Sequence, residues 1–531
     1  PTRLETWAHR LFARQNYRPK IVNKIIHYLK GNSLVICLGL VGSLLSVVSN
    51  FSGVGWSWDS SDYVAVGVNL ANGHGLLDAT GLLMTVRPPG LSVLIALGIW
   101  IGISANLFLL MLNALCSAIV VLGTYKLLKN AHVNHITLFI ATSFVAFSPA
   151  LLWQYSMAWS EPPFIALLII SMIVSQQRMT YSKATLMTLL MTALFFIRYV
   201  GPVFATALTL SSVLVNRKQL GTIKSIFTNS ACFVISLSPV WMWLVRNKRI
   251  DGTLTGARAP GGGSLLAPLK TLTGTFGSWI LGKPVEGGIY LSWNDYPASA
   301  KIVGIGFLFV LVILLVIYGL ISIREKIWTV KLPHVLILCA LISLSYIGFS
   351  TYRFVHWELG PLDNRMMIPI YVPIIIILAI VIEKIIPKQK FLRVVVCGIF
   401  IVGVGTHLTQ AVTDAIKFGR DGRHWSANSF QNSPINQFAK SLPTSSSLLS
   451  NQPQQLFAIW QQSSVFNQSQ LDAAQKATCE HRYFVWYNST YDDGTVNLEG
   501  QPEQAIPIYS DDSGTVFDLG ACSSDIAFYW P

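Results

Sequence analysis

The stretch WSWDSSDYVAVGVNLANGHGLLDATGLLMTVRPPG, residues 56–90, follows the first long apolar run of the chain, residues 33–52. It places three aspartates, a histidine and an arginine beside a segment long enough to cross a membrane. Ionisable side chains are costly inside a bilayer and usually face water or a functional cavity. The stretch therefore predicts a membrane protein with a polar working surface at one membrane face.

The composition of the whole chain agrees with a polytopic membrane protein. The 531 residues are 52% hydrophobic and 12% charged. The net charge of +14 would also suit nucleic-acid binding, but residues 412–531 hold 12 of the 24 acidic residues and 6 of the 38 lysines and arginines. Basic excess in membrane proteins marks cytoplasmic loops. The charge thus indicates topology, and we expect no nucleic-acid partner.

Apolar runs of about 20 residues have the length needed to span the hydrocarbon core. We count eleven candidate spans, of which three are short enough to be tilted or only partly spanning. They are 33–52, 106–125, 135–152, 161–176, 183–197, 199–215, 225–245, 301–323, 332–352, 366–385 and 391–410. A further short run, 90–103, starts at Gly90 directly after Pro88-Pro89. Prolines at this position favour a helix that starts on the membrane surface.

The basic clusters between these spans support the count. With eleven crossings every cluster falls on the same side, as the positive-inside rule requires. The chain is therefore expected in the plasma (inner) membrane with its N-terminus cytoplasmic. The segments expected on the outer face are 53–105, 153–160, 246–300, 353–365 and the tail from 411.

The tail, residues 411–531, is too polar to span and is predicted to be a small extracytoplasmic α/β domain beside a transmembrane module of residues 1–410. Strand-like runs at 483–487 and 515–519 alternate with prolines and turn pairs. Cys479 and Cys522 are its two cysteines, and a disulfide between them fits an oxidising compartment, the alternative being two free thiols.

Acidic and basic side chains recur in the loops expected on the outer face. A carboxylate there suits proton abstraction from an acceptor hydroxyl or amine, and a planar guanidinium suits two-pronged recognition of phosphate. The residues are Asp59, Asp62, His74, Arg87, Glu161, Arg198, Arg246, Asn247, Arg353, His356, Glu358, Asp363 and Arg365. Together they predict an enzyme that uses a lipid-phosphate substrate at the outer membrane face.

Several short motifs carry a family resemblance. They are Asp59-Ser60-Ser61-Asp62-Tyr63, Arg87-Pro88-Pro89-Gly90, Ser160-Glu161-Pro162, Ile197-Arg198-Tyr199-Val200-Gly201, and Asp363-Asn364-Arg365 with Ile368-Pro369. In order and topology they resemble the GT-C superfamily of integral membrane glycosyltransferases. Within it, the pattern is similar to the branch of protein O-mannosyltransferases and the lipid A aminoarabinose transferase, glycosyltransferase family 39 and relatives. The first loop lacks an Asp-x-Asp pair, so the metal site of the oligosaccharyltransferase branch is not predicted.

The resemblance implies a polyprenyl-phosphate sugar as donor and a glycan, lipid or protein as acceptor, with inversion at the anomeric carbon. Asp59 would be the general base, and Glu161 and Asp62 would orient acceptor or sugar. Arg198 and Arg365 would stabilise the leaving phosphate. The remaining substrate-binding candidates are Tyr63, Arg87, Arg246 and His356. No cofactor is expected, and the metal requirement stays open.

Simpler structural roles compete with these assignments. Asp59 would suit a helix N-cap, Asp62 a solvated position, and Arg198 a side chain extended toward the membrane surface. Arg365 would suit a local pair with Asp363. At the level of the whole protein, the alternatives are a lipid-linked polysaccharide polymerase or ligase, a secondary transporter, and an envelope scaffold. A transporter is disfavoured because its polar site is expected at mid-membrane between paired repeats.

Overall fold

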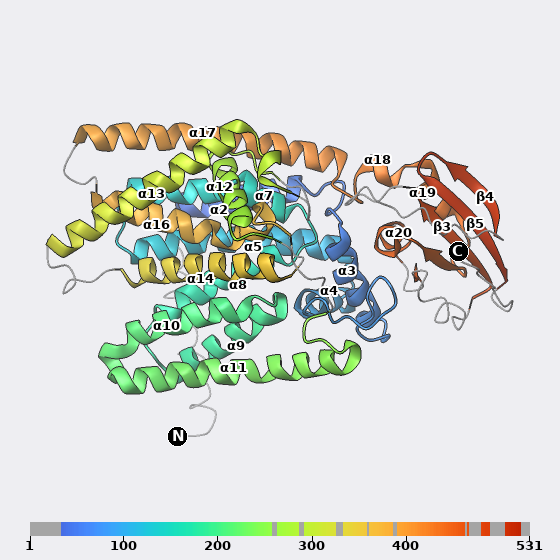
Figure 1. Cartoon of the computed structure of the whole chain (residues 1–531), viewed down its shortest axis with the longest axis horizontal. Helices are drawn as coiled ribbons and strands as arrows, with labels where there is room; N and C mark the ends of the chain where they lie inside the picture. Colours follow the sequence, from blue (N-terminus) through green and yellow to red (C-terminus); the bar gives the residue numbers. More distant parts are fainter. Residues whose placement is uncertain are drawn as a thin grey trace, which may run out of the picture.

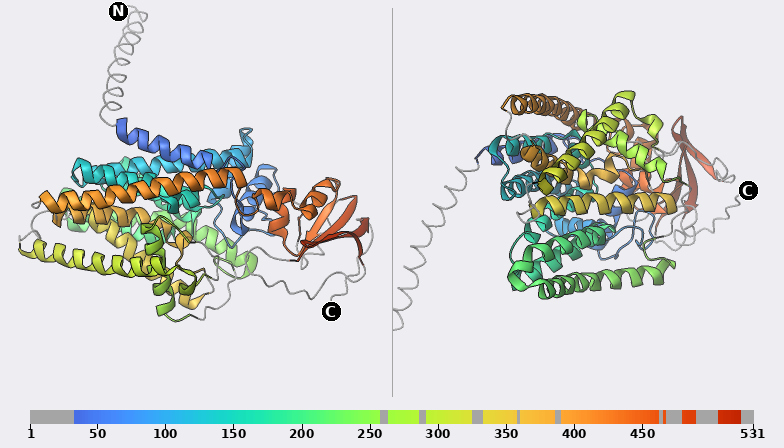
Figure 2. Two further views of the ribbon diagram at one scale, coloured as in Figure 1. Left: turned by 90° about the horizontal axis from the view of Figure 1, so that it is seen from above. Right: turned by 60° about the vertical axis from the view of Figure 1, so that its left-hand side comes forward.

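The computed structural model describes residues 33–256, 263–285, 291–324, 333–357, 360–385, 390–461, 465–466, 479–488 and 505–521. Long helices lie side by side in one bundle, and a small sheet with short helices is attached at one end (Figures 1 and 2). The described part is thus a mainly helical membrane protein with a small mixed-sheet domain, as its composition predicted.

The helices of the bundle correspond to the predicted apolar runs. They are α2 (Ser33–Val48), α5 (Ala105–Asn130), α6 (His135–Ala146), α7 (Pro149–Tyr155), α8 (Glu161–Ser175), α9 (Tyr181–Ile197), α10 (Gly201–Leu220), α11 (Thr222–Asp251), α13 (Ala298–Arg324), α14 (His334–His356), α16 (Tyr371–Ile385) and α17 (Lys390–Asp421). Within the described residues, six helices are long and apolar enough to cross a membrane, or seven spans if α6 and α7, bent by 42°, count as one. The total of eleven remains a prediction.

The structure also contains shorter helices. They are α3 (Trp58–Ala71), α4 (Gly90–Trp100), α12 (Leu266–Ile280), η2 (Trp293–Asp295), α15 (Asn364–Met367) and η4 (Ile368–Ile370). Of these, α3 and α4 lie at the end of the bundle nearest the sheet (Figure 1). α4 covers the run predicted as a juxtamembrane helix, and it packs against α3. These two helices frame the loop predicted to be the first on the outer face.

One long apolar stretch is interrupted where a charged residue occurs. α9 ends at Ile197, Arg198 has extended backbone angles (φ −148°, ψ 136°), and α10 begins at Gly201. A Cβ atom on Gly201 would lie 2.3 Å from the backbone nitrogen of Phe195, so this tight turn requires glycine. The turn fixes Arg198 at the end of two packed helices.

The tail forms a five-stranded sheet with helices packed against it. Its elements are α18 (Asn428–Gln431), α19 (Pro434–Ser441), β1 (Ser447–Ser450), α20 (Pro453–Trp460), β2 (Val465–Phe466), β3 (His481–Tyr487), β4 (Ile506–Asp511) and β5 (Gly514–Ala521). The strand order is β2-β1-β3-β5-β4. β1 is parallel to β2 and β3, whereas β5 is antiparallel to β3 and β4. β3 and β5 contain the two predicted strand runs.

The boundary between bundle and tail differs from the predicted one. α17 continues without a break to Asp421, past residue 411, where the tail was expected to begin. In the tail Cys479 is disulfide-bonded. Cys522 lies outside the described residues, so the pairing of these two cysteines stays a prediction.

The tail packs directly on α3. Ser61 donates a hydrogen bond of 2.8 Å to the backbone carbonyl of Gln454, 393 residues later in the chain. Trp56, just before α3, stacks on Phe457 of α20 with 6.2 Å between ring centroids. Trp425 and Trp58 are a further aromatic pair across this contact, at 6.4 Å. The helix that bears the first-loop aspartates is thereby held between α4 and the tail.

Candidate active site

Four separate segments bring charged side chains to one place at the tail end of the bundle. Asp59 lies in the first turn of α3, Glu161 is the first residue of α8, Arg198 follows α9, and Arg365 lies in α15. Arg87 joins them from the loop before α4. The sequence predicted each of these residues for the site, and the structure brings all five together.

Asp59 is the shared acid of this network. Arg87 donates to its Oδ1, with 2.8 Å between Nε and Oδ1, and Arg365 donates to Oδ2. The Asp59 carboxylate is about a third exposed, whereas the two arginine side chains are mostly buried. Burial alone would raise the pKa of Asp59, but the charges of Arg365 and Arg87 outweigh it and hold that pKa well below its usual range.

Glu161 is the fully buried acid of the network. Its Oε1 accepts from Arg198 and, at 3.0 Å, from Nε of Arg365. Its position at the start of α8 also suits the positive end of the helix dipole. Arg365 therefore links both acids, and its guanidinium lies 4.1 Å from the ring centroid of Trp159. These contacts hold the Arg365 guanidinium between two carboxylates and an aromatic ring.

Asp62 lies one turn along α3 and is buried, so the expectation of a solvated side chain is wrong. Arg87 donates to its Oδ2, while Oδ1 has no hydrogen-bond partner among the described residues. Burial raises the pKa of Asp62 to about 7; Arg87 opposes this shift, and Asp78 and Asp59 add to it. Because one arginine serves both acids, we assign the ionised state to Asp59 and the titrating state to Asp62.

The titration of Asp62 predicts a pH effect on stability. Between its ordinary pKa of 3.8 and about 7 the folded state holds a proton that the unfolded state has lost. The contribution of Asp62 to the free energy of unfolding therefore falls as pH rises through this window and is level above it. Asp62→Asn keeps the uncharged form at every pH. Its thermal midpoint relative to the wild type should rise between pH 5 and pH 8; a constant difference would contradict the shifted pKa.

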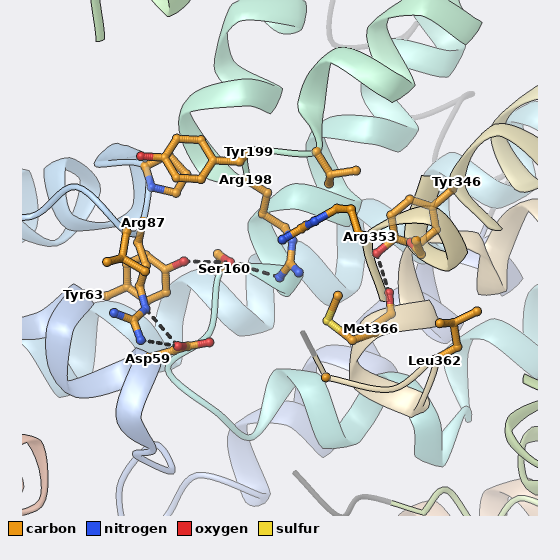
Figure 3. Close-up of a pocket in the computed structure, with 15 residues that line it drawn as sticks. Asp59, Tyr63, Arg87, Ser160, Arg198, Tyr199, Tyr346, Arg353, Leu362 and Met366 are labelled. Atoms are coloured by element: carbon orange, nitrogen blue, oxygen red, sulfur yellow. Dashed lines mark hydrogen bonds and ion pairs between the residues drawn. The ribbon is translucent and has the colours of Figure 1, made fainter. Parts of the chain in front are cut away.

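A cavity of about 200 Å³ opens beside this network (Figure 3). The charged residues in its wall are Asp59, Arg87, Arg198 and Arg353. Tyr63, Ser160, Tyr199, Tyr346 and Ser350 add hydroxyl groups. Three cations and one anion in the wall make the cavity suited to an anionic ligand that also approaches a carboxylate.

Hydroxyl groups position the wall residues. Tyr63 and Arg198 each donate to Oγ of Ser160, both at 3.2 Å, so a residue of α3 and a residue of the α9–α10 turn share one partner. Tyr199 donates to the carbonyl of Thr85 at 2.5 Å, two residues before Arg87. These hydrogen bonds of hydroxyl groups thus hold three loops in fixed positions relative to one another.

Two of the competing structural roles are excluded by these contacts. The N-cap of α3 is Ser57, and the Asp59 carboxylate is bound by arginines, so Asp59 is not the cap. Asp363 instead caps α15 by accepting from the backbone N–H of Met366 at 2.8 Å, while Arg365 pairs with the acids described above. Asp59 and Arg365 therefore pair within the charged network, and neither has the local structural role that competed with it.

Two predicted binding residues lie elsewhere. Arg246 donates to the carbonyl of Met84 at 2.6 Å and lies 4.5 Å from the ring centroid of Trp243. It supports the loop that carries Arg87 and is not part of the cavity wall. His356 lies near the exposed end of α14, with Nδ1 2.9 Å from the carbonyl of Tyr352, and is also outside the wall.

The structure adds residues that were not assigned to the site from sequence. Arg353 was noted as an outer-loop residue, but it belongs to the last turn of α14 and lines the cavity. Ser160 and Tyr199 sit inside quoted motifs, and Tyr346 lies within a predicted span. No group of three or more His, Cys, Asp or Glu residues in the described part of the chain is arranged to hold a metal ion.

Comparisons with known proteins place the fold. No protein-family model and no curated protein sequence matches this chain. Among solved structures, it superposes along nearly its whole length on membrane glycosyltransferases, and its fold is the GT-C fold that the loop motifs predicted. The chain is thus built as an integral membrane protein of this structural class.

One solved structure that the chain resembles is ArnT from Cupriavidus metallidurans. The likeness to ArnT bound to undecaprenyl phosphate has a TM-score of 0.56 at 11% identity and covers 93% of this chain and 99% of that one. The apo form gives 0.56 at 10% identity, with 95% and 98% covered. An apo oligosaccharyltransferase of Archaeoglobus fulgidus superposes with a TM-score of 0.49 at 10% identity, over 86% of this chain and 69% of that one.

Proposed function

We propose that this chain is a membrane glycosyltransferase that moves a sugar from a polyprenyl-phosphate donor to a hydroxyl or amine acceptor. The observation that carries the proposal is the cavity, in whose wall Asp59 lies beside Arg87, Arg198 and Arg353. A transfer from a phosphate-linked sugar needs a base for the acceptor and cations for the leaving phosphate, and this wall supplies both. The shared fold with ArnT, solved with undecaprenyl phosphate, supports the same donor class.

In the proposed reaction Asp59 accepts the proton of the acceptor group as its oxygen or nitrogen bonds to the anomeric carbon. The bond from that carbon to the phosphate oxygen breaks, and polyprenyl phosphate leaves with the electron pair. Attack opposite the leaving group inverts the anomeric centre. Arg198 faces the growing negative charge, and Glu161 and Ser160 hold its guanidinium in place.

Asp59 is a weak base while two arginines bind it, because their charges depress its pKa. An anionic phosphate in the cavity competes with Asp59 for Arg87, which also lines the wall. Any such withdrawal of an arginine raises the basicity of Asp59 at the moment when the donor is present. Donor binding therefore makes Asp59 a stronger base. Asp62 also pairs with Arg87, so the same change of partners affects Asp62.

We place the protein in the plasma (inner) membrane, with the cavity and tail on the outer face and the N-terminus in the cytoplasm. The acceptor is a glycan, lipid or protein, and it approaches between the cavity and the tail. The chain would consist of a transmembrane catalytic module and an outer domain. The outer domain supports α3 and the residues before it through Gln454, which accepts from Ser61, and Phe457, which stacks on Trp56.

The proposal is tested with the purified full-length protein and a panel of polyprenyl-phosphate sugars. Mass spectrometry follows free polyprenyl phosphate after an envelope extract is added as the acceptor source. Release of polyprenyl phosphate, with gain of the sugar mass on an acceptor, is the expected result. If the protein retains no polyprenyl-phosphate sugar at lipid concentrations that saturate the detergent micelles, the proposed donor is wrong.

A further inference from the structure

Arg353 is a cavity residue on a different structural element from the other cations. It lies in the last turn of α14, whereas Arg198 comes from the α9–α10 turn and Arg87 from the loop before α4. In Figure 3 the side chain of Arg353 extends toward the part of the cavity where Arg198 projects. Its guanidinium also lies 5.6 Å from the ring centroid of Phe349, one turn back on the same helix.

We propose that Arg353 and Arg198 form a two-arginine clamp for the phosphate of the polyprenyl carrier. This inference rests on the proposed function and specifies its phosphate subsite. It assigns to Arg353 the binding role that the sequence gave to Arg365. Arg365 is outside the cavity wall and is engaged by Asp59, Glu161 and Trp159.

The geometry of Arg198 fits a clamp. Its described contacts to Glu161 and Ser160 both involve Nη1. A guanidinium carries five N–H donors in a planar fork, so donors on Nε and Nη2 remain for a ligand. Glu161 neutralises one charge on the buried side, while Arg353 adds a second cation on the cavity side. Two cations that face one small cavity repel each other, and a bound anion relieves that repulsion.

The clamp also favours the leaving group over the donor. A polyprenyl-phosphate sugar is a phosphodiester with a single negative charge, whereas the released monophosphate carries close to two near neutral pH. Two arginines therefore bind the separating phosphate more strongly than the intact donor. Such differential binding lowers the barrier for breaking the bond, and it also predicts inhibition by the product.

The test compares the binding of undecaprenyl phosphate and undecaprenol to the detergent-purified full-length protein. The two lipids share the chain and differ in the phosphate. The wild type should bind the phosphate at least 10-fold more tightly than the alcohol, and Arg353→Gln should lose about 10- to 100-fold of the phosphate affinity while its affinity for the alcohol stays unchanged. Arg420→Gln removes an exposed arginine that pairs with Asp421 and should behave as the wild type.

The outcomes separate the two claims. If the wild type binds both lipids equally, the proposed function itself fails. If the wild type discriminates and Arg353→Gln discriminates as well, the clamp is overturned and the phosphate binds elsewhere. Arg353→Lys keeps the charge without the fork and carries the test if the glutamine variant does not fold. It should retain a preference for the phosphate that is weaker than in the wild type; an undiminished preference would contradict two-pronged binding by Arg353.

Discussion

Asp59→Asn is expected to reduce turnover of the polyprenyl-phosphate sugar by about 10²- to 10⁴-fold, the range typical of a lost general base. The substitution preserves shape but removes the charge that Arg87 and Arg365 share. Arg87, which lines the cavity, then has more positive charge to offer an anion there. Donor affinity should therefore be unchanged or higher, and the loss should fall on turnover. Single-turnover kinetics together with donor binding measure the two effects separately.

A suitable control for this variant is Asp295→Asn. Asp295 caps the short helix η2 by accepting from the backbone N–H of Ser292, and it is not in the cavity wall. It should turn over as the wild type does. Turnover of Asp59→Asn within a few-fold of the wild type would show that another group takes the proton. Loss of donor binding together with turnover would instead indicate that Asp59 is needed to build the cavity.

Glu161→Ala is expected to have the largest effect on stability. Glu161 is fully buried and pairs with Arg198 and Arg365, so its removal leaves two buried cations with less compensation. Breaking a buried pair by deleting one partner costs about 3–5 kcal/mol in the free energy of unfolding. The thermal midpoint of the variant in detergent should fall clearly. Arg198 should also lose its fixed position, and activity should drop with it.

Glu383→Ala provides the comparison. Glu383 lies near the end of α16, where it accepts a hydrogen bond of 2.9 Å from the hydroxyl of Thr137 and another from Asn134. Both donors are uncharged, so the removal of Glu383 leaves no buried cation without its counter-charge. Glu383, Thr137 and Asn134 are also partly exposed, so water can replace the lost carboxylate as a hydrogen-bond partner. The effect should therefore be smaller than for Glu161→Ala. Equal midpoints for the two variants would mean that the arginines near Glu161 find other partners.

Much of the fold follows from the sequence because hydrophobic length and charge asymmetry are local signals. Each predicted span contains or overlaps a helix, and the turn at Arg198 falls between two adjacent predicted runs. The end of α17 was missed because residues 411–421 include four charged residues and yet are helical. A search for apolar runs stops at such charges even where the helix continues.

The sequence predicted which residues belong to the site, but it did not predict which acid pairs with which arginine. Asp59, Glu161, Arg198 and Arg365 stand out because charges beside apolar runs are rare. Which acid meets which arginine depends on the packing of α3, α8 and α15, and sequence spacing does not encode this. Arg353 was named among the outer-face residues but received no binding role for the same reason, since only the direction of the last turn of α14 distinguishes it from other arginines at helix ends.

The contact between α3 and α20 has a consequence for biogenesis. α3 is made early in synthesis, but Gln454 and Phe457, on which Ser61 and Trp56 rest, emerge almost 400 residues later. The helix that carries Asp59 therefore lacks its support until the tail has been translated and folded. A chain that stops before the tail should hold an incomplete cavity. Under the proposed function, folding of the tail would thus act as a checkpoint that keeps unfinished copies from consuming lipid-linked sugar.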